Sequence, residues 1–128
     1  MSASIFSVVV DCREPRPQAE FWASVLSYDV TERNPDEFRV SDPKGQGSAL
    51  YFMRVPEAKV VKNRLHIDLA AEGPMEAAVE RLIGLGARVI DVRHDPQEFE
   101  NPDSWTVLQD PEGNEFCISS WTTITGAD

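Results

Sequence analysis

Asp110-Pro111-Glu112-Gly113-Asn114-Glu115-Phe116-Cys117 is the stretch that decides the fold, because a shorter version of it stands earlier in the chain. That earlier copy, Asp42-Pro43-Lys44-Gly45, also leads within a few residues into an apolar run, 49–52. Upstream of each copy lie one strand-like and one helix-like run, in the same order. A repeat of about half the chain length indicates two similar modules, and a site in such a protein uses corresponding positions of both.

The first module, residues 4–55, predicts the order β-α-β-β-β. The run Ile5–Asp11 is almost continuously apolar and β-branched, which is typical of a buried strand. Pro15 and Pro17 indicate a helix start. An apolar helical stripe follows at Phe21, Trp22, Val25 and Leu26. Further strands are expected at 28–32, 37–41 and 48–55, the first two around the turn Asn34-Pro35-Asp36.

The second module, residues 64–121, repeats that order after a polar linker, 56–63. A strand is expected at Arg64–Leu69, and Gly73-Pro74 opens a helix that Gly84 and Gly86 end. One face of that helix carries Met75, Ala78, Val79, Leu82 and Ile83. Strands are expected at 87–92, 104–109 and 115–119, with an acidic insertion, 94–103, on a surface loop. We therefore expect residues 1–128 to form a single α+β domain of two tandem βαβββ modules.

Charge and cysteine content narrow the possible partners and location. The chain of 128 residues has a formal net charge of -10 and a pI of about 4.6, which argues against nucleic acid and anionic membranes. An acidic surface could attract a cationic ligand or could serve solubility alone. The N-terminus lacks a signal-peptide pattern, and no apolar run approaches the roughly 20 residues of a membrane span. Two cysteines make no disulfide framework, so we expect a cytoplasmic protein with reduced thiols.

The two modules with their Asp-Pro-x-Gly turns resemble the vicinal oxygen chelate superfamily, and within it the glyoxalase-like and bleomycin-resistance-like proteins. The resemblance covers nearly the whole chain and is carried by three segments: 7–12 leading to Phe21-Trp22, Arg64–Leu69, and Asp110–Cys117. It implies a curled mixed sheet around a cleft in each module. It also implies metal ligands on the first and last strands of each module in the enzymatic members.

On this sequence the family's ligand positions fall at Ser7, at Ala49 or Leu50, at His66 and at Cys117. Of these, His66 keeps the usual ligand type, so we expect no resident cofactor, with His66 as the candidate if a divalent metal binds. Because side chains alternate along a strand, we expect Asp68 on the same face as His66 and Glu115 on the same face as Cys117. A His/Cys/carboxylate set suits Zn²⁺, but the alternative is a hydrogen-bonded cleft histidine beside a small buried cysteine.

Two functions stay open. The first is a glyoxalase-like lyase, isomerase or hydrolase acting on a small oxygenated metabolite, in which His66, Asp68 and Glu115 are catalytic. The second is a metal-free protein that sequesters a drug or metabolite, as bleomycin-resistance proteins do. In both, the predicted ligand-binding residues are Ser7, Val9, Leu50, Phe52, Trp105 and Cys117. The resemblance also implies a homodimer, to which Trp121 would contribute a packing or subunit contact.

Overall fold

The computed structural model describes residues 1–94 and 104–120. The chain separates into two compact units, Met1–Val60 and Val61–Asp128, and each is described by itself. The boundary between them lies inside the predicted linker 56–63. Residues 95–103 of the predicted insertion 94–103, and Trp121, lie outside the described residues.

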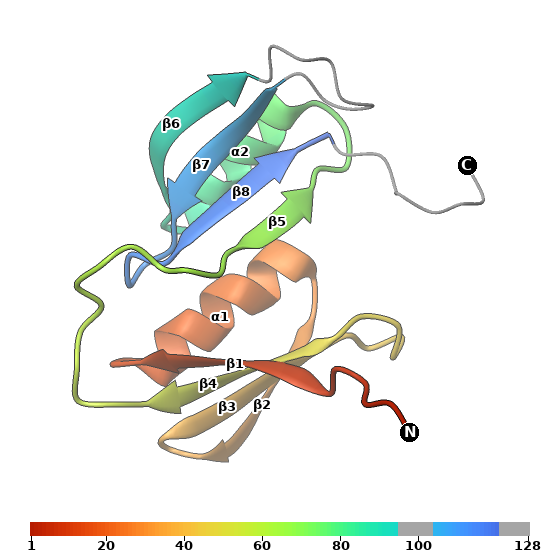
Figure 1. The fold of residues 1–128 in the computed structure, drawn as a ribbon, viewed down its shortest axis with the longest axis vertical. Helices are drawn as coiled ribbons and strands as arrows, with labels where there is room; N and C mark the ends of the chain where they lie inside the picture. Colours follow the sequence, from red (N-terminus) through yellow and green to blue (C-terminus); the bar gives the residue numbers. More distant parts are fainter. Residues whose placement is uncertain (95–103, 121–128) are drawn as a thin grey trace. The chain divides into compact units, whose positions relative to one another are not determined.

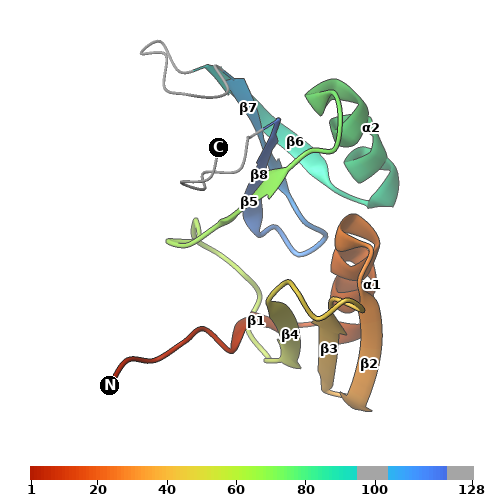
Figure 2. The same ribbon diagram turned by 90° about the vertical axis from the view of Figure 1, so that its right-hand side faces the viewer.

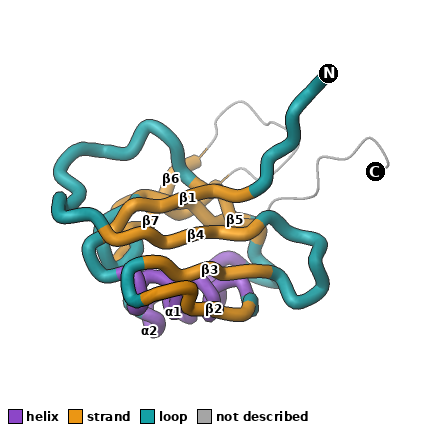
Figure 3. Tube along the Cα trace, turned by 90° about the horizontal axis from the view of Figure 1, so that it is seen from below, coloured by secondary structure: helices purple, strands orange, loops and turns teal. Residues whose placement is uncertain are grey.

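The first unit contains a four-stranded mixed sheet with one helix on it. Its elements are β1 (Ser7–Cys12), α1 (Pro15–Leu26), β2 (Asp29–Asn34), β3 (Glu37–Ser41) and β4 (Ala49–Arg54). The strand order is β1-β4-β3-β2, with β1 parallel to β4 and the other pairs antiparallel. The four strands can be followed side by side in that order in Figure 3.

The second unit repeats this arrangement. Its elements are β5 (Ile67–Ala70), α2 (Met75–Leu85), β6 (Arg88–His94), β7 (Ser104–Gln109) and β8 (Glu115–Ser119). The strand order is β5-β8-β7-β6, again with one parallel pair, β5 and β8. Each helix lies against one face of its own sheet (Figures 1 and 2). The predicted tandem βαβββ fold is confirmed.

The core of the first unit lies between α1 and its sheet. Phe38, Val40, Leu50 and Phe52 are each at most 5% exposed. Strand pairing puts them on one face, with Phe38 opposite Phe52 and Val40 opposite Leu50. The guanidinium of Arg16, on α1, lies over the ring of Phe38, so this is the face that the helix covers. Burial of each such side chain stabilises the fold by about 1.5–3 kcal/mol.

Two details of α1 follow from its sequence. Pro15 stands in the first turn, where its missing N–H costs no hydrogen bond. Phe21 and Trp22 are buried and pack edge to face, with ring centroids 5.3 Å apart. The predicted helical stripe therefore contributes Phe21 and Trp22 to the core.

The core of the second unit lies between α2 and the equivalent sheet face. Leu108, Phe116 and Ile118 are at most 5% exposed. The Thr106 hydroxyl donates to the Met75 sulfur of α2 at 3.5 Å, which identifies this face as the helix side. Of the predicted α2 stripe, all of it described, only Leu82 is fully buried. The helix ends at Gly86 with φ of 119°, whereas Gly84 lies inside it and is no stop signal.

The two Asp-Pro-x-Gly turns are built alike. In the first, the Asp42 carboxylate accepts hydrogen bonds from the backbone N–H groups of Lys44, Gln46 and Gly47 at 2.8–3.1 Å. In the second, Asp110 accepts from the backbone N–H groups of Glu112 and Asn114, both at 3.0 Å. Gly45 and Gly113 have φ of 69° and 91°, a conformation that glycine adopts without strain.

Two predicted strand features are wrong. The strand expected at Arg64–Leu69 begins at Ile67, because its parallel partner β8 begins at Glu115 and the first pair is Ile67 with Phe116. The first strand is buried only at its end: Val8 and Val9 are 42% and 53% exposed, whereas Cys12 is 2% exposed. The reason is that β1 is an edge strand, while α1 packs on β2, β3 and β4. Among the described helices, neither is long and apolar enough to cross a membrane.

Candidate functional site

The open face of the second sheet, which α2 does not cover, gathers the chemically active side chains. In the parallel pair of β5 and β8, Asp68 lies beside Cys117. In the antiparallel pair of β7 and β8, Val107 lies beside Cys117 and Gln109 beside Glu115. Because paired residues point to the same side of a sheet, these side chains share one face.

A pocket of about 320 Å³ lies on this face, and all of its lining belongs to the second unit. Polar and charged side chains from β5, β6, β8 and the segment before β5 converge on it, and β7 adds an aromatic and an aliphatic side chain. Its lining residues are Lys62, His66, Asp68, Arg93, Trp105, Val107, Glu115 and Cys117. Convergent polar groups beside an aromatic wall are the usual character of a small-molecule site.

His66 and Asp68 form the polar centre of the pocket. The His66 Nε2 lies 3.2 Å from the Asp68 Oδ1, and the two side chains are 42% and 56% exposed. A neutral imidazole that donates from Nε2 to this carboxylate keeps its lone pair on Nδ1. The Nδ1 of His66 can therefore accept a proton from a bound molecule.

Cys117 completes a group of three potential metal ligands. One ligand atom each of His66, Asp68 and Cys117 lies within 4.8 Å of the other two. Cys117 is 7% exposed, and burial, followed by the negative charge of Asp68, raises the pKa of its thiol. The cations Arg93 and Lys62 oppose this shift. At neutral pH the thiol is consequently protonated and unreactive.

Glu115 fixes the segment that precedes β5. Its Oε1 accepts a hydrogen bond from the backbone N–H of Asn63 at 2.9 Å. The Asn63 side-chain amide donates to Asn114 Oδ1, also at 2.9 Å, and the Asn114 amide donates to Asp110. This chain of contacts holds the approach to His66 against the turn. Sequence analysis missed Asn63, since no local pattern shows that it meets a turn about 50 residues later.

In the first unit the structure corrects the predicted site. Ser7 pairs with Ala49 and Val9 with Tyr51, so these residues share the open face of the first sheet. Leu50 and Phe52 lie on the opposite face, buried under α1 at 5% and 0% exposure. The prediction that Leu50 and Phe52 line a ligand surface with Ser7 and Val9 is therefore wrong. Every residue from Ala49 to Phe52 is apolar and buried, so alternation could not identify the helix side.

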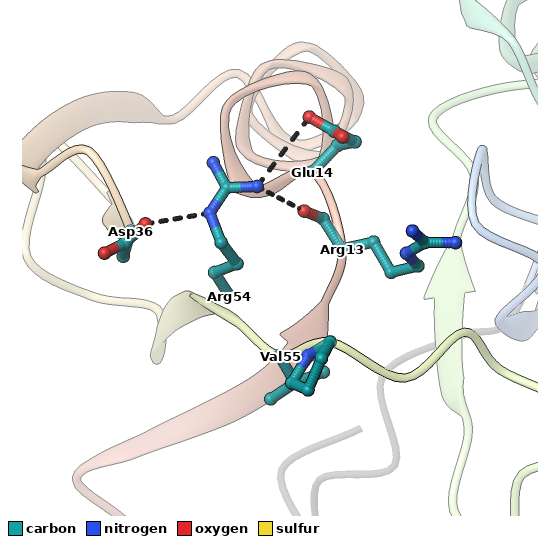
Figure 4. A pocket seen from close by; sticks show the side chains of 6 residues that line it. Arg13, Glu14, Asp36, Arg54 and Val55 are labelled. Carbon is teal, nitrogen blue, oxygen red and sulfur yellow. Dashed lines mark hydrogen bonds and ion pairs between the residues drawn. The ribbon is translucent and has the colours of Figure 1, made fainter.

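A second hollow, of about 390 Å³, lies in the first unit and was not predicted. Figure 4 shows Arg54 reaching between Asp36 and Glu14. Its Nε lies 2.8 Å from Asp36 Oδ1, and its Nη1 lies 4.0 Å from Glu14 Oε2 and donates to the Arg13 carbonyl at 2.7 Å. These contacts tie the end of β4 to the β1–α1 connection and the β2–β3 turn. Arg54 therefore has a structural role in this hollow.

The fold agrees with comparisons to known proteins. The sequence matches the profile of the glyoxalase-like domain over residues 7–119. The chain therefore belongs to the glyoxalase-like domain family, a branch of the vicinal oxygen chelate fold. Among curated proteins, none matches the sequence.

Several solved structures share the fold. A glyoxalase/bleomycin resistance protein/dioxygenase family enzyme from Burkholderia phytofirmans PsJN is 22% identical, with a TM-score of 0.67, over 91% of this chain and 97% of that one. A variant of the fosfomycin resistance protein FosX from Listeria monocytogenes was solved with Mn(II) and 1S,2S-dihydroxypropylphosphonic acid. It is 13% identical, with a TM-score of 0.72, over 95% of this chain and 93% of that one. At these identities the likeness shows the fold alone.

The metal that the fold implies can be tested against the donors present. At the family's ligand positions in the first unit, Ser7 and Ala49 offer neither an imidazole nor a carboxylate. In the second unit, the donors are a nitrogen, a carboxylate oxygen and a sulfur. Mn²⁺ prefers oxygen ligands, and sulfur is a poor ligand for it. This donor set therefore does not fit a manganese centre with ligands from both modules.

Proposed function

We propose that the protein is a glyoxalase-like enzyme that binds a small oxygenated organic molecule on the open face of the second sheet and moves a proton there without a metal. The observation that carries this proposal is the His66–Asp68 pair, 3.2 Å apart, in a pocket walled by Trp105. His66 is the proton acceptor and Asp68 its orienting partner. Lyase and isomerase reactions both need such a step.

The surrounding residues have separate roles in this proposal. Trp105 offers an apolar face against which a carbon skeleton can pack. Arg93 and Lys62 supply hydrogen-bond donors for ligand oxygens. Glu115, already bonded to the Asn63 backbone, orders the wall of the pocket and assists proton transfer. Cys117 contributes a small, neutral surface, because its thiol is protonated at neutral pH.

The test is a metabolite and antibiotic screen by thermal shift, performed in the presence of a chelator. Trp105 fluorescence should respond to any stabilising compound, and the response should vanish in Trp105→Phe. His66→Ala or Asp68→Asn should weaken binding by about 1–3 kcal/mol through lost hydrogen bonds. Val30→Ala, which alters an exposed residue of β2 in the first unit, is the matched control. A compound that stabilises parent, His66→Ala and Trp105→Phe equally would place the site elsewhere and contradict the proposal.

A sequestering protein is the second candidate function. It is supported by the acidic net charge of -10 and by Asp68 and Glu115 beside Trp105, which suit a cationic aromatic ligand. The discriminating measurement is turnover: a compound that binds in the screen is recovered unchanged from a sequestering protein and is converted by an enzyme. Ser7→Ala and Val9→Ala then test whether the predicted first-module residues Ser7 and Val9 contribute to binding.

The predicted homodimer and cytoplasmic location are part of this proposal. Both cysteines, Cys12 and Cys117, are buried free thiols, which suits a reducing compartment. Sedimentation at micromolar concentration should give about twice the chain mass of 14.3 kDa. A single species at the chain mass would contradict the dimer.

A further inference from the structure

We infer that the pocket of the second unit selects an organic carboxylate: Arg93 and Lys62 bind the carboxylate group, and Trp105 packs against the flat carbon skeleton of the same ligand. This ligand class rests on the proposed function, whose ligand occupies the same pocket. It follows from the side chains that line the pocket and from the hydrogen bonds that these side chains already make.

Arg93 and Trp105 are direct neighbours on two adjacent strands. They are paired in the antiparallel register of β6 and β7, and both line the pocket. Side chains directly opposite each other in such a pair have Cβ atoms about 4.5–5.5 Å apart. A ligand the size of one aromatic ring can therefore contact the indole with its carbon skeleton and the guanidinium with its oxygens.

Arg93 has hydrogen-bond donors that a ligand can use. Its guanidinium carries five N–H donors in a rigid fork. Asp91 accepts from the Nε donor, with its Oδ2 3.2 Å away. Among the residues that the structure describes, none accepts a hydrogen bond from the Nη atoms, which carry the remaining donors. Two parallel N–H···O bonds from such a fork match the two oxygens of a carboxylate.

Lys62 brings a second cation to the same pocket. Its Nζ donates to the carbonyl of Asn63 at 3.5 Å, which is long for a hydrogen bond, so the ammonium can turn to a ligand. Burial, followed by the charge of Asp68, raises the pKa of the Cys117 thiol. The charges of Arg93 and Lys62 oppose that shift, so both cations act on the interior of this pocket.

The acidic side chains of the pocket already have hydrogen-bond donors. Asp68 is paired with His66 at 3.2 Å, and Glu115 accepts from the backbone N–H of Asn63 at 2.9 Å. The cations therefore offer the larger share of the hydrogen bonds that a ligand can make, and they favour a negatively charged acceptor. The net charge of -10 opposes this choice only weakly, because charges beyond about 8 Å are largely screened at physiological salt.

The experiment compares benzoate with two probes of similar size, neutral benzamide and cationic benzylamine, on the full chain at neutral pH with a chelator present. Binding is followed by NMR of the Trp105 indole N–H, which is the signal that Trp105→Phe removes. Benzoate should shift this signal with an affinity about tenfold higher than that of benzamide, because hydrogen bonds between charged partners are stronger. Benzylamine should leave the signal unchanged.

Three outcomes overturn the inference. The first is equal affinity for benzoate and benzamide, or tighter binding of benzylamine, which would indicate a site for a neutral or cationic ligand. The second is an indole signal that benzoate does not shift at high millimolar concentration. The third is tighter binding of phenylphosphonate than of benzoate, which would assign the two cations to a phosphonate group instead of a carboxylate.

Two arginines of β6 provide matched variants. Arg93→Gln should weaken benzoate binding about tenfold, and Arg93→Lys, which keeps the charge but loses the fork, should restore only part of it. Arg88→Gln removes the same charge from the same strand outside the pocket lining, where Arg88 donates to Gln109, and should leave benzoate binding unchanged. Lys62→Gln should weaken binding less than Arg93→Gln does, because it removes a single-point donor.

Circular dichroism shows whether these variants are folded. Arg93→Gln that binds benzoate as the parent does, or Arg88→Gln that weakens binding equally, overturns the assignment of the carboxylate to Arg93. If Arg93→Gln does not fold, the comparison of benzoate with benzamide on the parent and on Lys62→Gln decides alone.

This test separates the inference from the proposed function. The carboxylate site depends on the charge of the probe and on Arg93, whereas the proposed function depends on His66 and on turnover. A neutral or cationic compound that binds at Trp105 and needs His66 removes the carboxylate site and leaves the proposed function. Benzoate binding that needs Arg93, beside a screen in which His66→Ala has no effect, leaves the carboxylate site and removes the proposed function.

Discussion

In the first module the parallel pair of β1 and β4 places Ser7 beside Ala49, whereas in the second module the equivalent pair of β5 and β8 places Asp68 beside Cys117. The helix sides of the two sheets are alike: Leu50 and Phe52 in one, Phe116 and Ile118 in the other, all at most 5% exposed. The repeat thus preserves the apolar face on which the helix packs. The side chains on the open face differ between the modules, and in the second module they form the candidate functional site.

The largest expected effect tests the shared helix side. Phe52→Ala should lower the free energy of unfolding by about 3–5 kcal/mol, because it leaves a cavity in a fully buried position. Phe116→Ala, in the second module, should cost a similar amount. Urea unfolding followed by circular dichroism measures both. A loss below about 1 kcal/mol in either variant would contradict the prediction that the two cores contribute similarly to stability.

The two aspartate turns allow a direct comparison between modules. Asp110→Ala should destabilise the protein by about 1–3 kcal/mol, since it removes buried acceptors for the backbone of Glu112 and Asn114. Asp42→Ala should cost less, because the Asp42 carboxylate bonds to exposed backbone that water can solvate instead. Thermal unfolding of the two variants in parallel is the measurement. Equal losses would show that burial does not distinguish the turns.

Gly47 marks a local difference between the modules. A Cβ at this position would lie 1.8 Å from the Tyr28 hydroxyl oxygen, so Gly47→Ala requires Tyr28 to move. We expect a loss of about 1–3 kcal/mol from this overpacking. In a Tyr28→Phe background, which removes the clashing oxygen, the same substitution should cost less. An unchanged cost in that background would show that the backbone of Gly47, and not the clash, is limiting.

The smallest effect concerns acid stability. Backbone hydrogen bonds, first from Lys44 and then from Gly47, hold the pKa of Asp42 below its ordinary value in the folded state. A depressed folded pKa contributes stability that is present above the unfolded pKa of about 3.9 and is lost as the pH falls through the folded pKa. Asp42→Asn should therefore lower the stability slightly near pH 7, where the parent carboxylate is charged, and flatten the acid side of the stability profile. Parallel profiles for parent and variant would contradict this assignment.

Much of the second-module site could be predicted from the sequence. Glu115-Phe116-Cys117-Ile118 alternates between polar and apolar residues closely enough to separate the helix side from the open side. The sequence also predicted Asp68 on the face of His66, and the pocket contains both. Asn63 could not be predicted, because its two hydrogen bonds reach residues more than 50 positions away.

The sequence by itself determined the repeat, the βαβββ order and the side-chain alternation within each strand, since these follow from local residue spacing. Only the tertiary structure decided which face of β4 meets the helix, because Ala49, Leu50, Tyr51 and Phe52 are all apolar and all buried. It also decided the register that sets Asp68 beside Cys117. Register and helix side depend on contacts between segments distant in the chain, and the apolar face that packs best against the helix is a property of the assembled module.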